Sequence, residues 1–118
     1  MANTMWYKKA LLCRASNRVF EIMYELLEKI YKEKQMNITS IKSLIEALDQ
    51  ETYGYGCVSK DLEEYFKTKS DYLTFAEMIN DVIQKIPPKY GLAKDDPAII
   101  RISELYTNLL KLIDSMKS

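Results

Sequence analysis

The feature that most constrains the fold of this chain is the spacing of its apolar residues, which recur every three or four positions through most of the sequence. At this spacing, side chains line one face of an α-helix. Glycine and proline, with three of each among 118 residues, are scarcer than a strand-rich fold requires. The pattern therefore predicts an all-α fold, in which residues 1–118 form a single-domain bundle of about five helices with a long first helix and short loops.

The first part of the chain carries the longest apolar stripe. It predicts one helix that begins near Asn3 or Thr4 and runs to about Lys34. The stripe consists of Leu12, Ser16, Val19, Met23, Leu26 and Ile30. A break in this helix is left open at the pair Ser16-Asn17.

The middle of the chain predicts two shorter helices. The second is capped by Asn37 or Thr39 and ends before a connector rich in tyrosine and glycine, residues 52–57. The third is capped by Ser59, with Asp61 among the acidic residues of its first turn, where the helix dipole favours negative charge. These acids could therefore be helix-start residues and need no binding role.

The last third of the chain predicts two more helices. Thr74–Glu77 forms a capping box, which predicts the start of the fourth helix. Pro87-Pro88 predicts its end, because a proline disfavours helical geometry in the residue before it. Asp96-Pro97 predicts the start of the last helix, whose apolar seam extends over Ile99–Met116.

The overall charge and the cysteine count indicate where such a chain would work. There are 17 basic and 17 acidic residues, and this balance argues against binding to nucleic acid or to an anionic membrane through net charge. The N-terminus lacks the pattern of an export signal, and no run of about 18 apolar residues occurs. We expect a cytoplasmic protein with no membrane contact, in which Cys13 and Cys57 are free thiols.

Few groups in the sequence suit catalysis or cofactor binding. There is no histidine, the commonest general base near neutral pH and the commonest zinc ligand. Gly54 and Gly56 form a Gly-x-Gly pair without the further residues of a phosphate-binding loop. Residues 49–60 open like an EF-hand calcium loop, but Lys60 occupies the position of the last ligand. We expect no enzymatic activity, no catalytic residues, no cofactor and no metal site.

Residues 49–64 form the predicted working surface. The helical period breaks there, and two tyrosines lie on a glycine-containing connector. Tyrosine is enriched at protein interfaces, and binding residues are often found on loops. Residues 36–66 hold six acidic side chains against two basic ones. A partner-binding surface is predicted at Asp49, Glu51, Tyr53, Tyr55, Asp61, Glu63 and Glu64. The alternative is a solvated helix face, with the tyrosine rings folded over helix ends.

The chain combines a small size, a helical pattern, the absence of histidine and an acidic aromatic patch around Tyr53-Gly54-Tyr55-Gly56. In these features it resembles the small all-helical immunity proteins that neutralise bacterial toxins of the colicin and contact-dependent inhibition types. The resemblance is to the class and assigns no role to an individual residue. It implies a protein-binding inhibitor whose partner is a cognate toxin, a basic domain such as an RNase or DNase. Acidic groups would then occupy the positions where the toxin binds phosphates.

Two other functions are left open by the sequence. A helical regulator could bind nucleic acid through the basic N-terminal residues, although no basic recognition helix follows a turn. The residues concerned are Lys8, Lys9, Arg14 and Arg18. A self-associating scaffold or homodimer could instead use the seam Ile99–Met116 as an interface, although such a stripe is more often part of a core.

Overall fold

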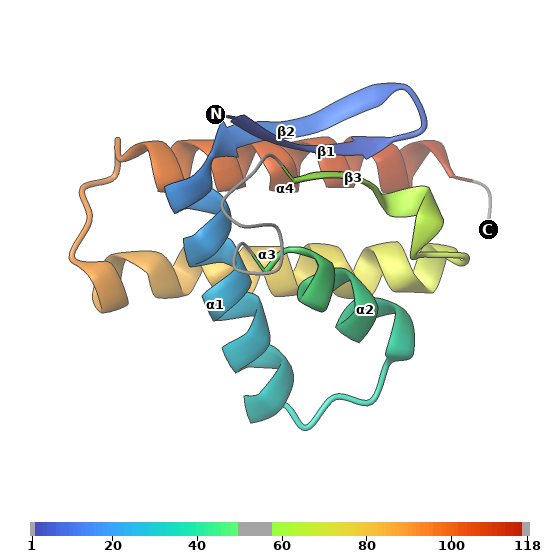
Figure 1. Cartoon of the computed structure of the whole chain (residues 1–118), viewed down its shortest axis with the longest axis horizontal. Coiled ribbons are helices and arrows are strands. Elements are labelled where there is room, and N and C mark those ends of the chain that lie inside the picture. The colour runs from blue at the N-terminus through green and yellow to red at the C-terminus, as the bar shows by residue number, and fades with distance from the viewer. Residues whose placement is uncertain (1, 50–57, 117–118) are drawn as a thin grey trace.

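The structure is a computed structural model that describes residues 2–49 and 58–116. Within these ranges it contains four α-helices and one three-stranded mixed sheet, so the fold is α+β and the all-α prediction is wrong (Figure 1). The elements in chain order are β1 (Ala2–Tyr7), β2 (Ala10–Ser16), α1 (Asn17–Glu33), α2 (Thr39–Ala47), β3 (Ser59–Asp61), the 3-10 helix η2 (Leu62–Glu64), α3 (Lys69–Tyr90) and α4 (Pro97–Ser115).

The predicted long first helix is a β-hairpin followed by α1. Burial alternates along the hairpin: Asn3 and Met5 are buried while Thr4 between them is partly exposed. This two-residue period belongs to a strand with one covered face. Ser16 does not lie inside a helix but caps α1, its hydroxyl accepting a hydrogen bond from the Val19 amide at 3.4 Å. The break considered at residues 16–17 is thus where the helix begins.

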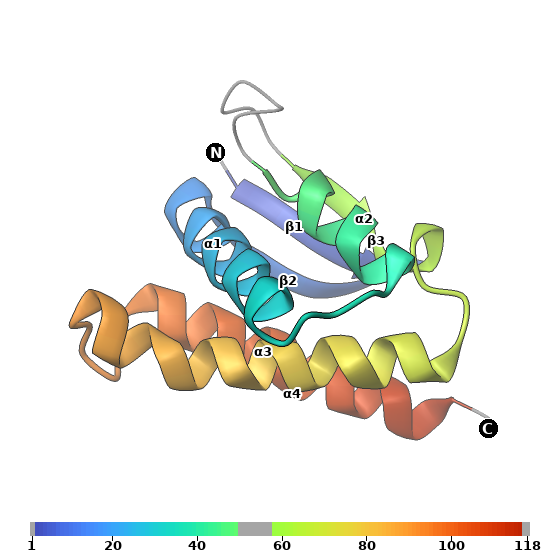
Figure 2. The same cartoon turned by 90° about the horizontal axis from the view of Figure 1, so that it is seen from below.

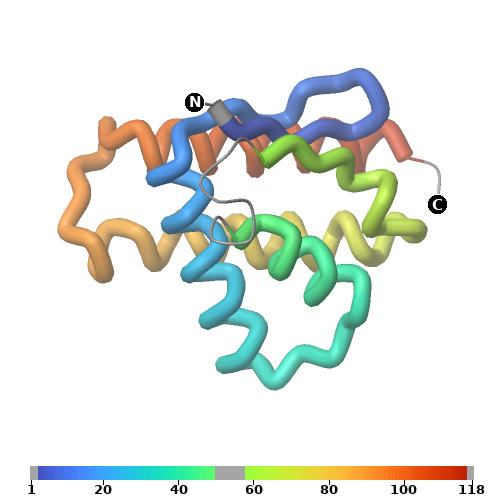
Figure 3. The backbone as a smooth tube through the Cα atoms, viewed as in Figure 1, coloured from blue at the N-terminus to red at the C-terminus, as the bar shows by residue number. Residues whose placement is uncertain are grey.

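The sheet joins segments that are distant in the sequence, as the blue and green segments that run side by side in Figure 3 show. β1 lies in the centre, antiparallel to β2 and parallel to β3. The predicted third helix is wrong, because Ser59 belongs to β3, where its hydroxyl accepts a hydrogen bond from Thr4 Oγ1 at 2.9 Å. The chain then turns into the short η2, capped by Asp61. Pairing with the edge of β1 therefore overrides the local helix-start signal.

One buried polar side chain holds the three strands and α1 together. Asn3 is fully buried, and its Oδ1 accepts a hydrogen bond from the Val58 amide at 2.7 Å. Its Nδ2 donates to Asn17 Oδ1 at 2.7 Å and, more weakly, to the Ala15 carbonyl at 3.5 Å. These bonds satisfy the buried amide and fix the chain at its return to the sheet.

Helices α3 and α4 form a long antiparallel pair, and α1 and the sheet pack against it (Figures 1 and 2). The start of α4 is confirmed: Asp96 accepts a hydrogen bond from the Ala98 amide at 2.9 Å, and Pro97 is the first helical residue. Much of the apolar seam of α4 is buried in the core. The fully or nearly fully buried seam residues are Ile102, Leu109 and Ile113.

Both predicted ends of the fourth helix are wrong. α3 begins at Lys69 with Thr68 as its cap, so Thr74 lies inside the helix. Pro87-Pro88 does not end it, because both prolines are exposed and the carbonyls they leave unbonded can face solvent. The helix ends at Tyr90 and is capped by Gly91, which has a positive φ of 62° that glycine adopts without strain.

Candidate functional site

Three of the predicted partner-binding residues, Glu51, Tyr53 and Tyr55, lie outside the described residues. The other four are placed in two groups. Asp49 follows α2, whereas Asp61, Glu63 and Glu64 lie at the far end of β3 and in η2. Asp61 is three residues beyond Val58, about 10 Å along an extended chain.

The acidic group at the end of β3 is tied to the turn between β1 and β2. Asp61 Oδ1 accepts hydrogen bonds from the Lys8 amide at 3.1 Å and from the Glu63 amide at 2.9 Å. The Glu63 carboxylate pairs with Lys8 Nζ at 3.6 Å, while Glu64 is exposed. An exposed pair of this kind contributes between about 0 and 1 kcal/mol to stability. Asp61 and Glu63 therefore have structural partners, and the side chains of Glu63 and Glu64 remain exposed.

The solvent side of the sheet carries a surface that helix-based reasoning missed. Directly opposed residues on neighbouring strands point to the same side of a sheet. The pairs Thr4–Arg14, Trp6–Leu11, Thr4–Ser59 and Trp6–Asp61 therefore share one face. We call these six residues, Thr4, Trp6, Leu11, Arg14, Ser59 and Asp61, the outer sheet face. Figure 1 shows the sheet along the top of the molecule, with α1, α2 and α3 below the sheet and α4 beside it, in contact with β2.

Trp6 lies at the centre of the outer sheet face. Its Nε1 donates a hydrogen bond to Thr4 Oγ1 at 2.9 Å, and this hydroxyl in turn donates to Ser59 Oγ at 2.9 Å. The indole is thus tethered to Thr4 on the same strand. Its neighbour Leu11 is 45% exposed, the largest value among the exposed large hydrophobic residues of the described chain. The sequence carries no clear signal for this face, because Met5, Trp6 and Tyr7 are consecutive apolar or aromatic residues and show no polar–apolar alternation.

A second feature lies where four segments meet at one end of the molecule (Figure 2). The end of β1, η2, the start of α3 and the end of α4 enclose an open cavity of about 560 Å³, which we call the end cavity. Residues that line it include Tyr7, Glu63, Phe66, Lys67, Tyr72 and Met116. The ring of Tyr72 meets that of Tyr7 edge to face with a centroid distance of 5.7 Å, and that of Phe66 at 5.1 Å.

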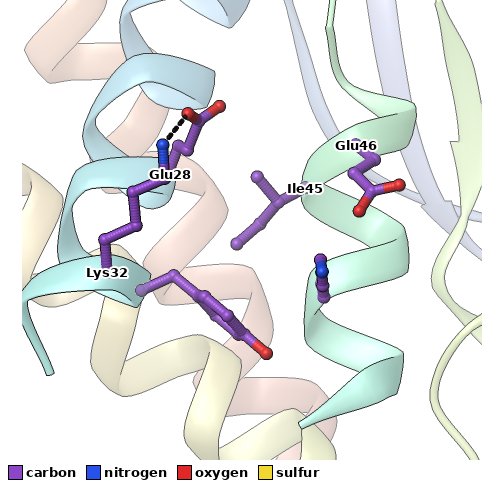
Figure 4. Close-up of a pocket in the computed structure, with 6 residues that line it drawn as sticks. Glu28, Lys32, Ile45 and Glu46 are labelled. Atoms are coloured by element: carbon purple, nitrogen blue, oxygen red, sulfur yellow. Dashed lines mark hydrogen bonds and ion pairs between the residues drawn. The ribbon is translucent and has the colours of Figure 1, made fainter. Parts of the chain in front are cut away.

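A smaller cavity of about 230 Å³ lies between α1 and α2. In Figure 4, Ile45 points from α2 into this space, and the ion pair between Glu28 and Lys32 lies on the α1 side. That pair is short, at 2.7 Å, and the hydrogen bond from Lys32 holds the pKa of Glu28 below its ordinary value. The Tyr31 hydroxyl accepts from the Ile38 amide at 3.1 Å. Two of the polar side chains that line this cavity, Glu28 and Lys32, are therefore paired with each other, and Tyr31 is bonded to the backbone.

The basic residues considered for nucleic-acid binding lie on different elements and partly in ion pairs. Arg18 binds Asp96 at 3.2 Å and Lys8 binds Glu63. Arg14 is exposed on β2, and Lys9 is in the turn. The four residues thus do not share one helix.

Cys13, on the inner side of β2, is buried and free. Burial, followed by the charge of Glu104, raises the pKa of its thiol to about 12. The thiol is therefore protonated at neutral pH. It is a poor nucleophile and a poor metal ligand in the folded state.

In residues 2–49 and 58–116, no three or more Cys, Asp or Glu side chains are grouped so that they could hold a metal ion. No helix within the same ranges combines the length and the apolar character needed to cross a membrane. No protein-family model, curated protein or solved structure matches the chain.

Proposed function

We propose that the protein binds another protein through the outer sheet face and inhibits that partner by occupying its surface. The observation that carries the proposal is the tethered Trp6 beside the exposed Leu11 on a sheet face that the described helices leave open. Protein interfaces concentrate their binding energy in a few aromatic and apolar anchors surrounded by a polar rim. Arg14 and Asp61 supply such a rim here.

The hydrogen bonds of Trp6 make it a suitable anchor. A side chain that must be immobilised on binding costs about 0.5–1.5 kcal/mol, and the bonds through Thr4 and Ser59 have already restricted this indole. The three strands also hold the face on hydrogen-bonded sheet rather than on a loop, with a shift in the β1–β2 register between Met5 and Trp6. Little conformational entropy would therefore be lost when a partner binds.

The charges around the face favour an oriented partner. Asp61, Glu63 and Glu64 lie on the β3 side, and Arg14 lies on the β2 side. A partner with a basic surface opposite β3 would be steered and aligned by these charges. In its specific form, the proposal is that this partner is a toxin domain with a basic substrate groove. The sheet removes the all-helical fold on which the resemblance to immunity proteins partly rested, so the proposal is based on this surface.

The test begins with capture of the partner by the purified, tagged chain, using the proteins encoded beside its gene. The dissociation constant of the captured complex is then measured for Leu11→Arg and for Leu110→Arg. Leu110 is the matched control, because it is 44% exposed but lies on α4. We expect Leu11→Arg to weaken the complex by at least about tenfold and Leu110→Arg to leave it unchanged.

Two readouts extend this test. Trp6 is the only tryptophan of the chain, so a change in its fluorescence on complex formation reports on the outer sheet face directly. Co-expression with the partner should relieve the partner's toxicity in cells, and Leu11→Arg should abolish that relief. Equal affinities for the two arginine variants would reject the outer sheet face, and unrelieved toxicity would reject the inhibitor role.

A further inference from the structure

We propose that the end cavity receives a basic side chain of the protein partner. Its guanidinium or ammonium group lies with the Glu63 carboxylate on one side and the aromatic pair Tyr7 and Tyr72 on the other. This inference deepens the proposed function and rests on it. The cavity adjoins the acidic end of β3, because Glu63 both lines it and follows Asp61. One partner could therefore contact the outer sheet face and the end cavity together.

The Tyr72 hydroxyl is the observation that points to a ligand. Tyr72 lines the end cavity and only 4% of its surface is exposed. Its hydroxyl makes no hydrogen bond with any protein group in the described chain, although its ring has two aromatic contacts. A buried polar group without a partner is costly, so a ligand that supplies one gains free energy on binding.

The charges near this hydroxyl favour a cationic ligand. Burial raises the pKa of Tyr72 above its ordinary value, and the nearby Tyr7 and the carboxylates of Glu63, Asp61 and Asp71 raise it further. The phenol is therefore neutral, and its oxygen lies in a negative potential. A guanidinium or ammonium N–H can donate to that oxygen and lie against the electron-rich face of an aromatic ring.

The chain's own Lys8 shows how a cation fits at the mouth of the cavity. Its Nζ lies 5.5 Å from the centroid of the Tyr7 ring and 3.6 Å from Glu63 Oε2. A ligand cation would displace Lys8 from Glu63. Lys67 and Lys69 also line the cavity and oppose a second positive charge, although Lys67 Nζ is engaged by the Glu63 carbonyl at 3.0 Å. Removal of Lys8 should consequently strengthen the binding of a cation and weaken that of an anion.

The test titrates the full-length chain with Nα-acetyl-arginine amide, Nα-acetyl-lysine amide and, as the anionic probe, Nα-acetyl-glutamate amide, followed by amide chemical shifts. We expect at least one of the two cationic probes to shift the residues lining the end cavity, with a dissociation constant on the order of 10 mM, and the glutamate probe to have no effect. Tyr72→Phe should weaken this binding about tenfold, whereas Tyr106→Phe on α4 should not.

Lys8→Ala is the decisive variant, because the inference predicts the direction in which the affinity for the cationic probe changes. It should tighten binding of the cationic probe about threefold, whereas Lys9→Ala, at the next position of the same turn, should leave it unchanged. Weaker cation binding in Lys8→Ala, binding of the glutamate probe, or absence of shifts for both cationic probes would each overturn the inference.

The same variants separate this inference from the proposed function. In the partner complex, a loss of affinity with Leu11→Arg but none with Tyr72→Phe or Glu63→Gln would reject the end cavity alone. If none of the three variants changed the affinity, both proposals would be wrong. A loss with all three would support both.

Discussion

Replacement of Asn3 tests whether one buried amide holds β3 in place. Asn3→Ala removes the acceptor of the Val58 amide, and Val58 is 1% exposed, so water cannot readily replace it. An orphaned buried group costs about 1–3 kcal/mol, and the void left by the side chain adds to this cost. Asn17 is only partly buried and can be rehydrated. We therefore expect a loss of about 2–3 kcal/mol in the free energy of unfolding.

The assay is urea denaturation at neutral pH, followed by Trp6 fluorescence and by circular dichroism. Hydrogen exchange should show the Val58 amide losing its protection in Asn3→Ala. The matched control is Asn108→Ala, which removes a single bond to the Leu12 carbonyl at 2.8 Å and should cost about 1 kcal/mol. A loss below about 0.5 kcal/mol in Asn3→Ala would refute the reasoning.

A second substitution at the same position adds a pH dependence. Asn3→Asp keeps an acceptor for Val58 but replaces the donor to Asn17 and Ala15 by a carboxyl group. Burial should raise the pKa of that carboxyl in the folded state above its unfolded value of about 4. The unfolded state then releases the proton more readily, so stability should fall as the pH rises above about 4. A pH-independent difference from the wild type would contradict this account.

Three further predictions concern single side chains. Tyr72→Phe removes a hydroxyl without a protein partner, so the free energy of unfolding should stay equal or rise by up to about 1 kcal/mol. Tyr31→Phe loses the hydrogen bonds to Ile38 and should lower the free energy of unfolding by about 1 kcal/mol. Urea denaturation measures both changes. Cys13 should resist iodoacetamide at pH 8 in a Cys57→Ser variant, because burial raises the pKa of its thiol to about 12, and rapid labelling of the folded protein would contradict its burial. The hydrogen bonds from the Ala98 amide and from Arg18 lower the pKa of Asp96. The stability that Asp96 contributes should therefore be lost as the pH falls through that lowered pKa. In the same denaturation assay, the free energy of unfolding of Asp96→Asn should depend less on pH in the acid range.

Helices whose signals are local were visible in the sequence. The start of α4 was predicted at the correct residue because a cap and a first-turn proline act within a few positions. The apolar period also identified helical segments that became α1, α2 and α3, although it misplaced several of their ends. Each backbone bond of a helix joins residues four apart, so the pattern that stabilises it lies within one stretch of sequence.

The candidate sites were predicted only in part. Asp61, Glu63 and Glu64 lie together at the end of β3 and in η2, whereas Asp49, which the sequence grouped with them, follows α2. Trp6 and Leu11 were not selected, because both were assigned to the first predicted helix, and only the pairing of β1 with β2 places them side by side. Tyr7 and Tyr72 were likewise not expected to meet, as 65 positions separate two residues that form one aromatic contact.

The sequence by itself determined that the chain has enough apolar residues at helical spacing to form several packed helices, with α4 beginning at Pro97. Only the tertiary structure decided that residues 2–16 form a hairpin and that Ser59–Asp61 joins it as a third strand. Thr4 and Ser59 lie 55 positions apart, and their pairing exists only once the helices between them have brought both segments to the same side of the core. Strand pairs and the cavities between elements depend on such long-range closure, which no local pattern encodes.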